Sequence, residues 1–130
     1  MQRSSTVTLR RALFAEASEI IADEYADELV LEDIARRVAS SRRQLQRAFA
    51  EVGHTSFRTY LADYRMDRAA ELLDQTDLAI REVAGSVGYR QPAQFAKAFR
   101  RRYGCSPSEY RIAQRSRPPA SGPAQLARAA

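Results

Sequence analysis

The sequence predicts an all-α fold of about seven helices, built as two similar helical units joined by a long linker helix. Apolar residues recur at helical spacing along most of the 130 residues, and no window shows the period-two alternation of a strand. Part of the chain also matches a second part about 50 positions further on. Hydrophobic residues make up 45% of the chain and charged residues 28%, a balance typical of a folded domain.

The first unit is expected to contain three helices. Apolar residues from Leu9 onward recur on one face, which predicts a helix from Thr8 to Tyr25. A second short helix and a tight turn follow. Because Ser41 matches a capping box with the glutamine three positions later, the next helix should begin at Arg42.

The linker helix is expected from Phe57 to Leu73, with Ser56 as its N-cap. The second unit should end in a short helix from Ser108 to Arg115, and the Pro-, Ala- and Ser-rich residues beyond it predict a disordered tail. The linker side chains predicted to be buried are Phe57, Tyr60, Leu61, Tyr64, Ala69, Leu72 and Leu73. The expected divisions are an N-terminal tail at 1–7, the first unit at 8–56, the linker helix at 57–74, the second unit at 75–113 and the C-terminal tail at 114–130.

The internal repeat indicates that each unit is a helix-turn-helix. The offset between the copies is 49 before the turn and 50 after it, so the second turn holds one extra residue. Arg47 and Lys97 occupy the same position in the two copies, between apolar neighbours, and should face away from the core. Isolated helical pairs are common, but two matched copies with a cation at one exposed position favour DNA binding. The matched pairs are Leu31/Ile80, Ile34/Val83, Ala35/Ala84, Val38/Val87, Leu45/Phe95, Arg47/Lys97, Ala48/Ala98, Phe49/Phe99, Ser56/Ser106 and Tyr60/Tyr110.

Charge is unevenly distributed along the chain, whose net charge is +5. Eight acids and no base lie between Glu16 and Asp33, so the rest of the chain is strongly basic. A basic body favours a polyanion such as nucleic acid, because bound cations release the counterions condensed on phosphates. The alternative is an ordinary solvated surface.

The sequence contains no motif of an enzyme or a cofactor site. It has no phosphate-binding glycine loop, metal-ligating cluster or acid-base pair, and no nucleophile motif surrounds His54, the single histidine. Cys105 is the only cysteine, which excludes an intrachain disulfide and indicates a reducing compartment. No stretch approaches 18 apolar residues, and no export signal is present. We therefore expect a cytoplasmic, nucleoid-associated protein without a cofactor and without membrane contact.

Together these residues resemble the DNA-binding domain of the AraC/XylS family of bacterial transcription regulators. The resemblance covers about residues 31–111 and is most specific in the second unit, where IREVAGSVGY is followed by QFAKAFRRRYGCSPSEYR. The Val-Gly-aromatic triplet, two phenylalanines four apart, Gly-x-Ser-Pro and the closing Tyr-Arg match the family pattern. The resemblance implies a transcription activator that binds double-stranded promoter or operator DNA and works with RNA polymerase.

The resemblance also implies which residues contact DNA, because the second helix of each unit enters the major groove in this family. Arginine can donate two hydrogen bonds to guanine, and glutamine can pair with adenine. The implied base contacts are Arg43, Gln46, Arg47, Ala93, Gln94 and Lys97, and the implied phosphate contacts are Ser41, Arg42, Arg90, Gln91, Arg100 and Arg101.

The two recognition helices should differ in how many bases they read. Gln91, Pro92 and Ala93 stand where the family usually has small hydroxyl residues, and Gln91 is a poor helix cap. The second unit should therefore read fewer bases than the first. The linker helix of about 17 residues is roughly 26 Å long. With its flanking turns it approaches the roughly 34 Å of one duplex turn, which allows contact with successive major grooves.

A glycine of the family pattern is displaced in the first unit. Gly104 follows Phe99 by five positions, whereas His54 is the fifth residue after Phe49 and Gly53 comes one residue early. Histidine tolerates the left-handed conformation better than most residues, so His54 is expected to end the helix.

The sequence leaves two other functions open, and it also leaves open the role of Cys105. The chain could be the DNA-binding part of a larger regulator, since family members usually carry a sensor or dimerisation domain. It could instead be a protein-interaction module whose acidic first helix is the working surface, and a salt-dependent gel shift on random DNA would separate that function from the others. Cys105 is either a small half-buried side chain or a redox-sensing thiol.

Overall fold

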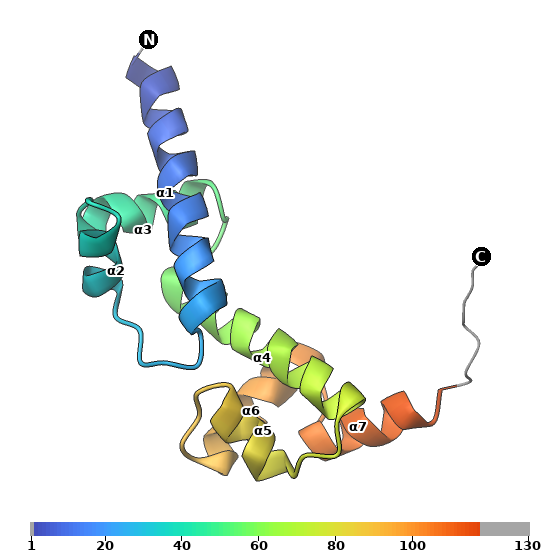
Figure 1. Ribbon diagram of the computed structural model, residues 1–130. Coiled ribbons are helices and arrows are strands. Elements are labelled where there is room, and N and C mark those ends of the chain that lie inside the picture. The colour runs from blue at the N-terminus through green and yellow to red at the C-terminus, as the bar shows by residue number, and fades with distance from the viewer. Residues whose placement is uncertain (1, 118–130) are drawn as a thin grey trace.

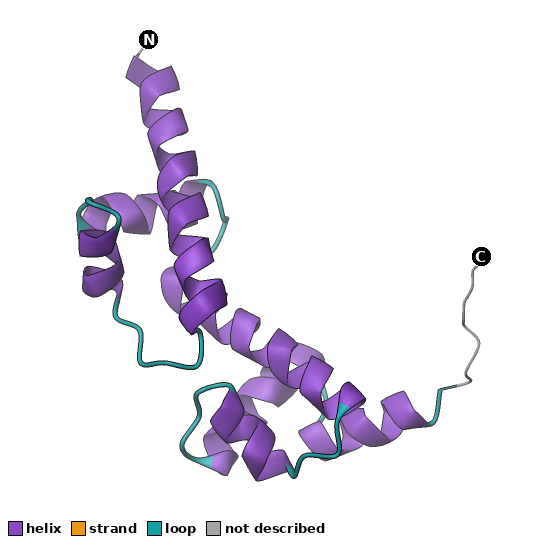
Figure 2. Cartoon of the chain, viewed as in Figure 1, coloured by secondary structure: helices purple, strands orange, loops and turns teal. Residues whose placement is uncertain are grey.

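The computed structural model describes residues 2–117, and within this range it contains seven helices and no strand (Figures 1 and 2). Figure 1 shows α1–α3 at one end of α4 and α5–α7 at the other end. The prediction of an all-α fold with two helical units joined by a long helix is therefore confirmed. The helices are α1 (Gln2–Glu24), α2 (Leu31–Arg37), α3 (Arg42–Glu51), α4 (Phe57–Gln75), α5 (Ile80–Ser86), α6 (Pro92–Tyr103) and α7 (Pro107–Arg115).

The first helix begins earlier than predicted. α1 starts at Gln2, so residues 2–7 continue the helix and do not form a separate tail. This segment contains neither proline nor glycine, the two residues that most oppose a helix. Val7 and Leu9 are 45% and 48% exposed, so this end of α1 projects past the core (Figure 1). The prediction placed the start at the first apolar residues, whereas the backbone continues the helix without their burial.

The repeat found in the sequence is also present in the backbone. α2 and α5 each span seven residues and start 49 positions apart. The left-handed residues repeat as well, because Ala39 (φ 56°) corresponds to Gly88 (φ 97°), and His54 (φ 56°) corresponds to Gly104 (φ 81°). His54 does adopt the left-handed conformation, but the prediction that it ends the helix is wrong, because α3 already ends at Glu51.

The displaced glycine of the first unit has a packing role. A Cβ atom at Gly53 would lie 2.7 Å from the ring of Phe14 and 2.9 Å from the carbonyl oxygen of Phe49. Any side chain would therefore push α1 away from the end of α3. A glycine at this position allows Phe14 of α1 to pack closely against the chain.

Each unit has a separate buried core. Phe49 is fully buried in the first core, where the ring centroids of Phe14, Phe57 and Tyr60 lie 5.2, 5.9 and 5.6 Å from its own. Phe99, its counterpart in the repeat, is fully buried in the second core. A buried phenylalanine thus lies in the core of each unit, one at each end of α4.

α4 contributes to both cores and extends two residues beyond its predicted end. Ser56 caps it as predicted, by accepting a hydrogen bond of 3.1 Å from the amide of Thr59. Leu61 is buried in the first core, whereas Met66, Ala69, Ala70 and Leu73 are buried in the second. Burial was thus predicted correctly for Leu61, Ala69 and Leu73, but Phe57, Tyr60, Tyr64 and Leu72 are half-buried and the buried Met66 and Ala70 were missed. The prediction assumed one continuous apolar stripe, whereas α4 faces a different core with each half.

The last helix begins at Pro107, one residue before the prediction, and ends at Arg115 as predicted. Residues 114–115 therefore belong to α7 and not to the expected tail, while 118–130 lie outside the described residues. Over the described range, none of the helices combines the length and apolar character that crossing a bilayer requires.

Candidate nucleic-acid interface

α3 is the second helix of the first helix-turn-helix, and it begins at Arg42 as predicted. The Ser41 hydroxyl accepts a hydrogen bond of 3.1 Å from the amide of Gln44, which is one of the two bonds of the expected capping box. Leu45 and Phe49 are fully buried and fix one face of the helix against the core. The opposite face is left to solvent.

The candidate base contacts of α3 are all exposed. Arg43 and Arg47 line one shallow hollow of about 270 Å³ with Ser41 and Gln44, while Gln46 points into a larger groove. Within the described range, no carboxylate lies at ion-pair distance from Arg43 or Arg47. Both guanidinium groups are available to a partner.

α6 is the corresponding helix of the second unit. Gln91 makes no side-chain hydrogen bond as its N-cap and Pro92 occupies the first turn, which confirms the expected weak cap. Phe95 and Phe99 are fully buried, so the helix presents its opposite face to solvent. The exposed residues on that face are Ala93, Gln94 and Lys97.

Two of the candidate phosphate contacts are held in surface ion pairs. The Nε atom of Arg42 lies 3.4 Å from the carboxylate of Glu32, and a terminal nitrogen of Arg100 lies 3.7 Å from that of Glu109. All four side chains are more than half exposed, so these pairs contribute little stability and a phosphate can replace the carboxylate. The remaining candidates, Ser41, Arg90, Gln91 and Arg101, are exposed.

The acidic run of the first unit is partly used inside the unit itself. Arg37 donates two hydrogen bonds, of 2.8 and 2.6 Å, to the carboxylate of Glu24. These bonds outweigh the effect of desolvation and lower the pKa of Glu24 below its ordinary value. Asp33 forms an ion pair with Arg36 through one of its carboxylate oxygens. These two acids therefore neutralise arginines of α2, and of the arginines of α3 only Arg42 has a carboxylate of the described residues, that of Glu32, at ion-pair distance.

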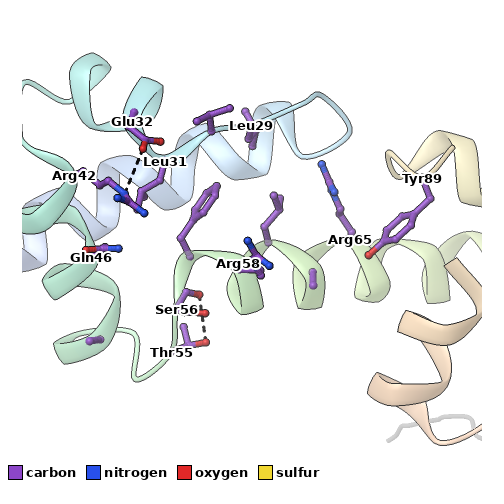
Figure 3. Close-up of a pocket in the computed structure, with 15 residues that line it drawn as sticks. Leu29, Leu31, Glu32, Arg42, Gln46, Thr55, Ser56, Arg58, Arg65 and Tyr89 are labelled. Carbon is purple, nitrogen blue, oxygen red and sulfur yellow. Dashed lines mark hydrogen bonds and ion pairs between the residues drawn. The ribbon is translucent and has the colours of Figure 1, made fainter. Parts of the chain in front are cut away.

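A groove of about 670 Å³ runs from the first unit along the first half of α4 to Tyr89 of the second unit (Figure 3). Arg42 and Gln46 of α3 line one end, Arg58 from the first turn of α4 lies in the middle, and Tyr89 lies at the far end. The groove therefore joins the exposed face of α3 to the turn that leads into α6.

A second hollow of about 420 Å³ adjoins this groove. The two share Leu29, Leu61 and Arg65 as lining residues, and the second one reaches Arg90 just before α6. Candidate contacts from both units, Arg42, Gln46 and Arg90, thus line two adjoining hollows.

Arg58 was not predicted from the sequence as a DNA contact, but it shares the exposed position of the residues that were predicted. It is exposed, lies in the groove and has no carboxylate at ion-pair distance within the described range. It also stands at the second position of α4, where the helix dipole disfavours a cation. A base at the unfavourable end of a capped helix was the signal in the sequence that could have identified it.

Asp67 of α4 ties α6 in place. Arg102 donates hydrogen bonds of 3.1 and 3.0 Å to its two carboxylate oxygens, and the Tyr103 hydroxyl donates one of 2.6 Å. Partial burial by itself would raise the pKa of Asp67, but the bonds from Arg102 and Tyr103 outweigh it and hold the pKa below its ordinary value. The charged carboxylate therefore stabilises the position of α6.

Acid is expected to remove this stabilisation. Because the folded-state pKa of Asp67 is lowered, its contribution is present above the unfolded-state pKa and is lost as the pH falls through the folded-state value. Asp67→Asn should therefore lower the free energy of unfolding more at about pH 7 than at about pH 2.5, as measured by urea titration. An equal difference at both pH values would contradict this role.

The comparisons with known proteins agree with this geometry. A family model described as a helix-turn-helix domain matches residues 34–113. The Msm operon regulatory protein of Streptococcus mutans is 34% identical over 101 residues, which cover 78% of this chain and 36% of that protein. The chain thus spans about a third of that relative.

Two solved structures are similar to this chain over most of their own length. An AraC-type regulator from Chromobacterium violaceum is 32% identical with a TM-score of 0.77, over 82% of this chain and 95% of that one. The DNA-binding domain of AdpA, solved with a target DNA, is 33% identical with a TM-score of 0.76, over 83% and 96%. The chain belongs to the AraC family of helix-turn-helix transcription regulators.

Proposed function

We propose that the chain binds one double-stranded DNA sequence as a monomer, with α3 and α6 in successive major grooves on one side of the duplex. The observation that carries the proposal is the pair of adjoining hollows, of which one is lined by Arg42 and Gln46 and the other by Arg90. The 19 residues of α4 span about 28 Å. With the flanking turns, this length suits two helices separated by about 34 Å, one turn of DNA.

Sequence would be read mainly by the first unit. Arg43 and Arg47 are exposed on one face of α3 with no opposing carboxylate in the described range, which suits bidentate bonds to guanine. In α6, Gln94 and Lys97 supply the polar groups and Ala93 can contact only an apolar base edge such as the thymine methyl. The proposed base contacts are Arg43, Gln46, Arg47, Ala93, Gln94 and Lys97.

The phosphate backbone would be held by the ends of both recognition helices and by the groove between them. Arg58 is added here because it lies in the middle of that groove. Contacts of this kind position the protein on the duplex without reading sequence. The proposed phosphate contacts are Ser41, Arg42, Arg58, Arg90, Gln91, Arg100 and Arg101.

Selection of bound duplexes from a random library of about 25 base pairs tests the proposal. We expect the enriched sequences to contain two short conserved blocks about one helical turn apart, with the longer block assigned to α3. Enrichment of no sequence would contradict specific binding. Enrichment of a single block would contradict the use of both units.

Arg58→Ala should weaken binding without changing which sequence is preferred. Loss of one phosphate contact lowers the affinity for all duplexes to a similar extent. It also lowers the magnitude of the slope of log K against log salt concentration by about one. Arg11→Ala, which removes an exposed arginine of α1 far along the chain from the groove, is the control for net charge. A salt slope that changes equally in both variants would refute a direct contact by Arg58.

We further propose that the bound chain raises transcription through contact with RNA polymerase, supported by its membership of a family of transcription regulators. Reporter expression from a promoter that carries the selected site upstream should increase when the chain is present. A decrease would indicate repression instead. The chain spans 36% of the Streptococcus mutans relative, so a role as the DNA-binding part of a larger effector-sensing regulator is part of the same proposal.

A further inference from the structure

The two units meet at a junction that contains one arginine of the linker helix. Arg65 donates a hydrogen bond from Nε to the carbonyl oxygen of Tyr25, at 2.7 Å, and one from Nη2 to that of Asp27, at 2.9 Å. Its guanidinium carbon lies 5.8 Å from the ring centroid of Tyr89 (Figure 3). A single side chain of α4 thus contacts the α1–α2 loop of the first unit and the α5–α6 turn of the second.

The backbones of the two units also lie close to each other at this junction. A Cβ atom at Gly88 would lie 3.0 Å from the carbonyl oxygen of Ala26 and 3.2 Å from the guanidinium carbon of Arg65. Tyr25 packs against both cores, and its ring centroid lies 5.4 Å from that of Tyr64. The turn of one unit and the loop of the other therefore approach until no side chain fits between them.

The contacts of Arg65 lie outside the two cores, whereas Tyr25 packs against both. The main helix packing is of α1 with α3 in the first unit and of α4 with α5, α6 and α7 in the second. Arg65 is half-buried and belongs to neither core. The first unit is therefore attached to the rest by the side chains of the first half of α4 and by the junction. Loss of the Arg65 contacts would leave both cores intact and weaken the attachment of one unit to the other.

We propose that Arg65 is a positioning residue for DNA binding, which fixes α3 relative to α6 and so sets the spacing between half-sites that the chain accepts. This inference rests on the proposed function. Two linked units bind most tightly when the linkage already matches the spacing of their sites. A looser linkage lowers the effective concentration of the second unit at the preferred spacing and tolerates other spacings.

The geometry requires an arginine rather than any cation. A guanidinium group is planar, so it can donate to two carbonyl oxygens in one plane while its face lies near an aromatic ring. Lysine is a point donor on a flexible stem and cannot reproduce this arrangement. Arg65→Lys should therefore give an intermediate effect, whereas Arg65→Met keeps an unbranched apolar side chain and removes both hydrogen bonds.

Arg111 offers a matched control. It donates from Nε to the carbonyl oxygen of Leu73 at 3.0 Å and from Nη2 to that of Thr76 at 3.2 Å, and it is half-buried like Arg65. Its bonds, however, connect α7 to the end of α4 within the second unit. Arg111→Met loses the same kind of interaction and should lower stability without changing the relation between the units.

The first test measures affinity of the full chain for duplexes in which about one to three base pairs are inserted between the selected half-sites. Wild type and Arg111→Met should lose about tenfold or more with each change of spacing, because the second unit no longer reaches its groove. Arg65→Met should bind the original duplex about tenfold less tightly and show little dependence on spacing. A dependence as steep in Arg65→Met as in wild type would overturn the proposal.

The second test requires no DNA. Spin labels at Ala50→Cys and Ser108→Cys, in a Cys105→Ser background, report the distance between the two units, since both positions are exposed. The distance distribution should be narrow in wild type and in Arg111→Met, broader in Arg65→Lys and broadest in Arg65→Met. If Arg65→Met does not fold, the Arg65→Lys comparison decides.

The two tests separate this inference from the proposed function. Equal widths of the distance distributions in wild type and the Arg65 variants would overturn the positioning role alone, whatever the chain does with DNA. A wild-type chain that prefers no duplex would overturn the proposed function, and the inference on spacing with it.

Discussion

Replacing Arg47 with alanine is expected to lower the affinity of the chain for its preferred duplex by about 1 to 3 kcal/mol. Arg47 is exposed on α3 beside Arg43, and no carboxylate of the described residues pairs with it. Loss of a bidentate bond to guanine should also relax the preference at one base position. Titrations with the selected duplex and with duplexes changed at single positions would measure both effects.

Lys97→Ala is the matched comparison, because Lys97 occupies the position of Arg47 in the second copy of the repeat. Its ammonium group is a point donor, and α6 has a weaker cap and fewer polar residues on its exposed face than α3. We therefore expect a smaller loss of specific binding than for Arg47→Ala. A loss that is equal or larger would refute the proposed asymmetry between the two recognition helices.

Phe49→Ala is expected to have the largest effect on stability, about 3 to 5 kcal/mol. The ring is fully buried, and its centroid lies within 5.2 to 5.9 Å of those of Phe14, Phe57 and Tyr60, so its removal leaves a cavity at the centre of the first core. Such a loss is a large part of the total stability of a small domain. Urea unfolding followed by the amide signals of individual helices would measure it.

The two cores make this prediction specific to one unit. Phe49→Ala should weaken the signals of α2 and α3 at lower urea than those of α6 and α7, and Phe99→Ala, at the equivalent buried position, should reverse the order. Simultaneous loss of all helices in both variants would show instead that the units unfold as a single core.

Most of the fold follows from local sequence patterns. The repeat defined the two units, and Ser41 and Ser56 located the starts of α3 and α4, because hydroxyl caps act on amides only three residues away. The predicted start of α1 was wrong because no capping residue or core contact marks the true start. The burial pattern of α4 was only partly correct, since the pattern of one helix does not reveal that it serves two cores.

The candidate interface was predictable to the extent that it lies on the exposed faces of two short helices. All residues nominated on α3, on α6 and before them are exposed. Arg58 and Arg65 were missed for different reasons. Arg58 gains its meaning from a groove formed by several elements, and Arg65 from carbonyl oxygens 40 and 38 residues away in the chain. When a side chain bonds to the backbone of a distant loop, the residue types in that loop do not reveal the contact, so the sequence shows no pattern.

Hydroxyl-radical footprinting of the chain on its selected duplex tests the central claim most directly, because it reports which side of the helix is covered. We predict two protected regions on one side of the duplex, with centres about 10 base pairs apart. Protection on opposite sides, or of one region alone, would contradict the account of two recognition helices held one turn apart.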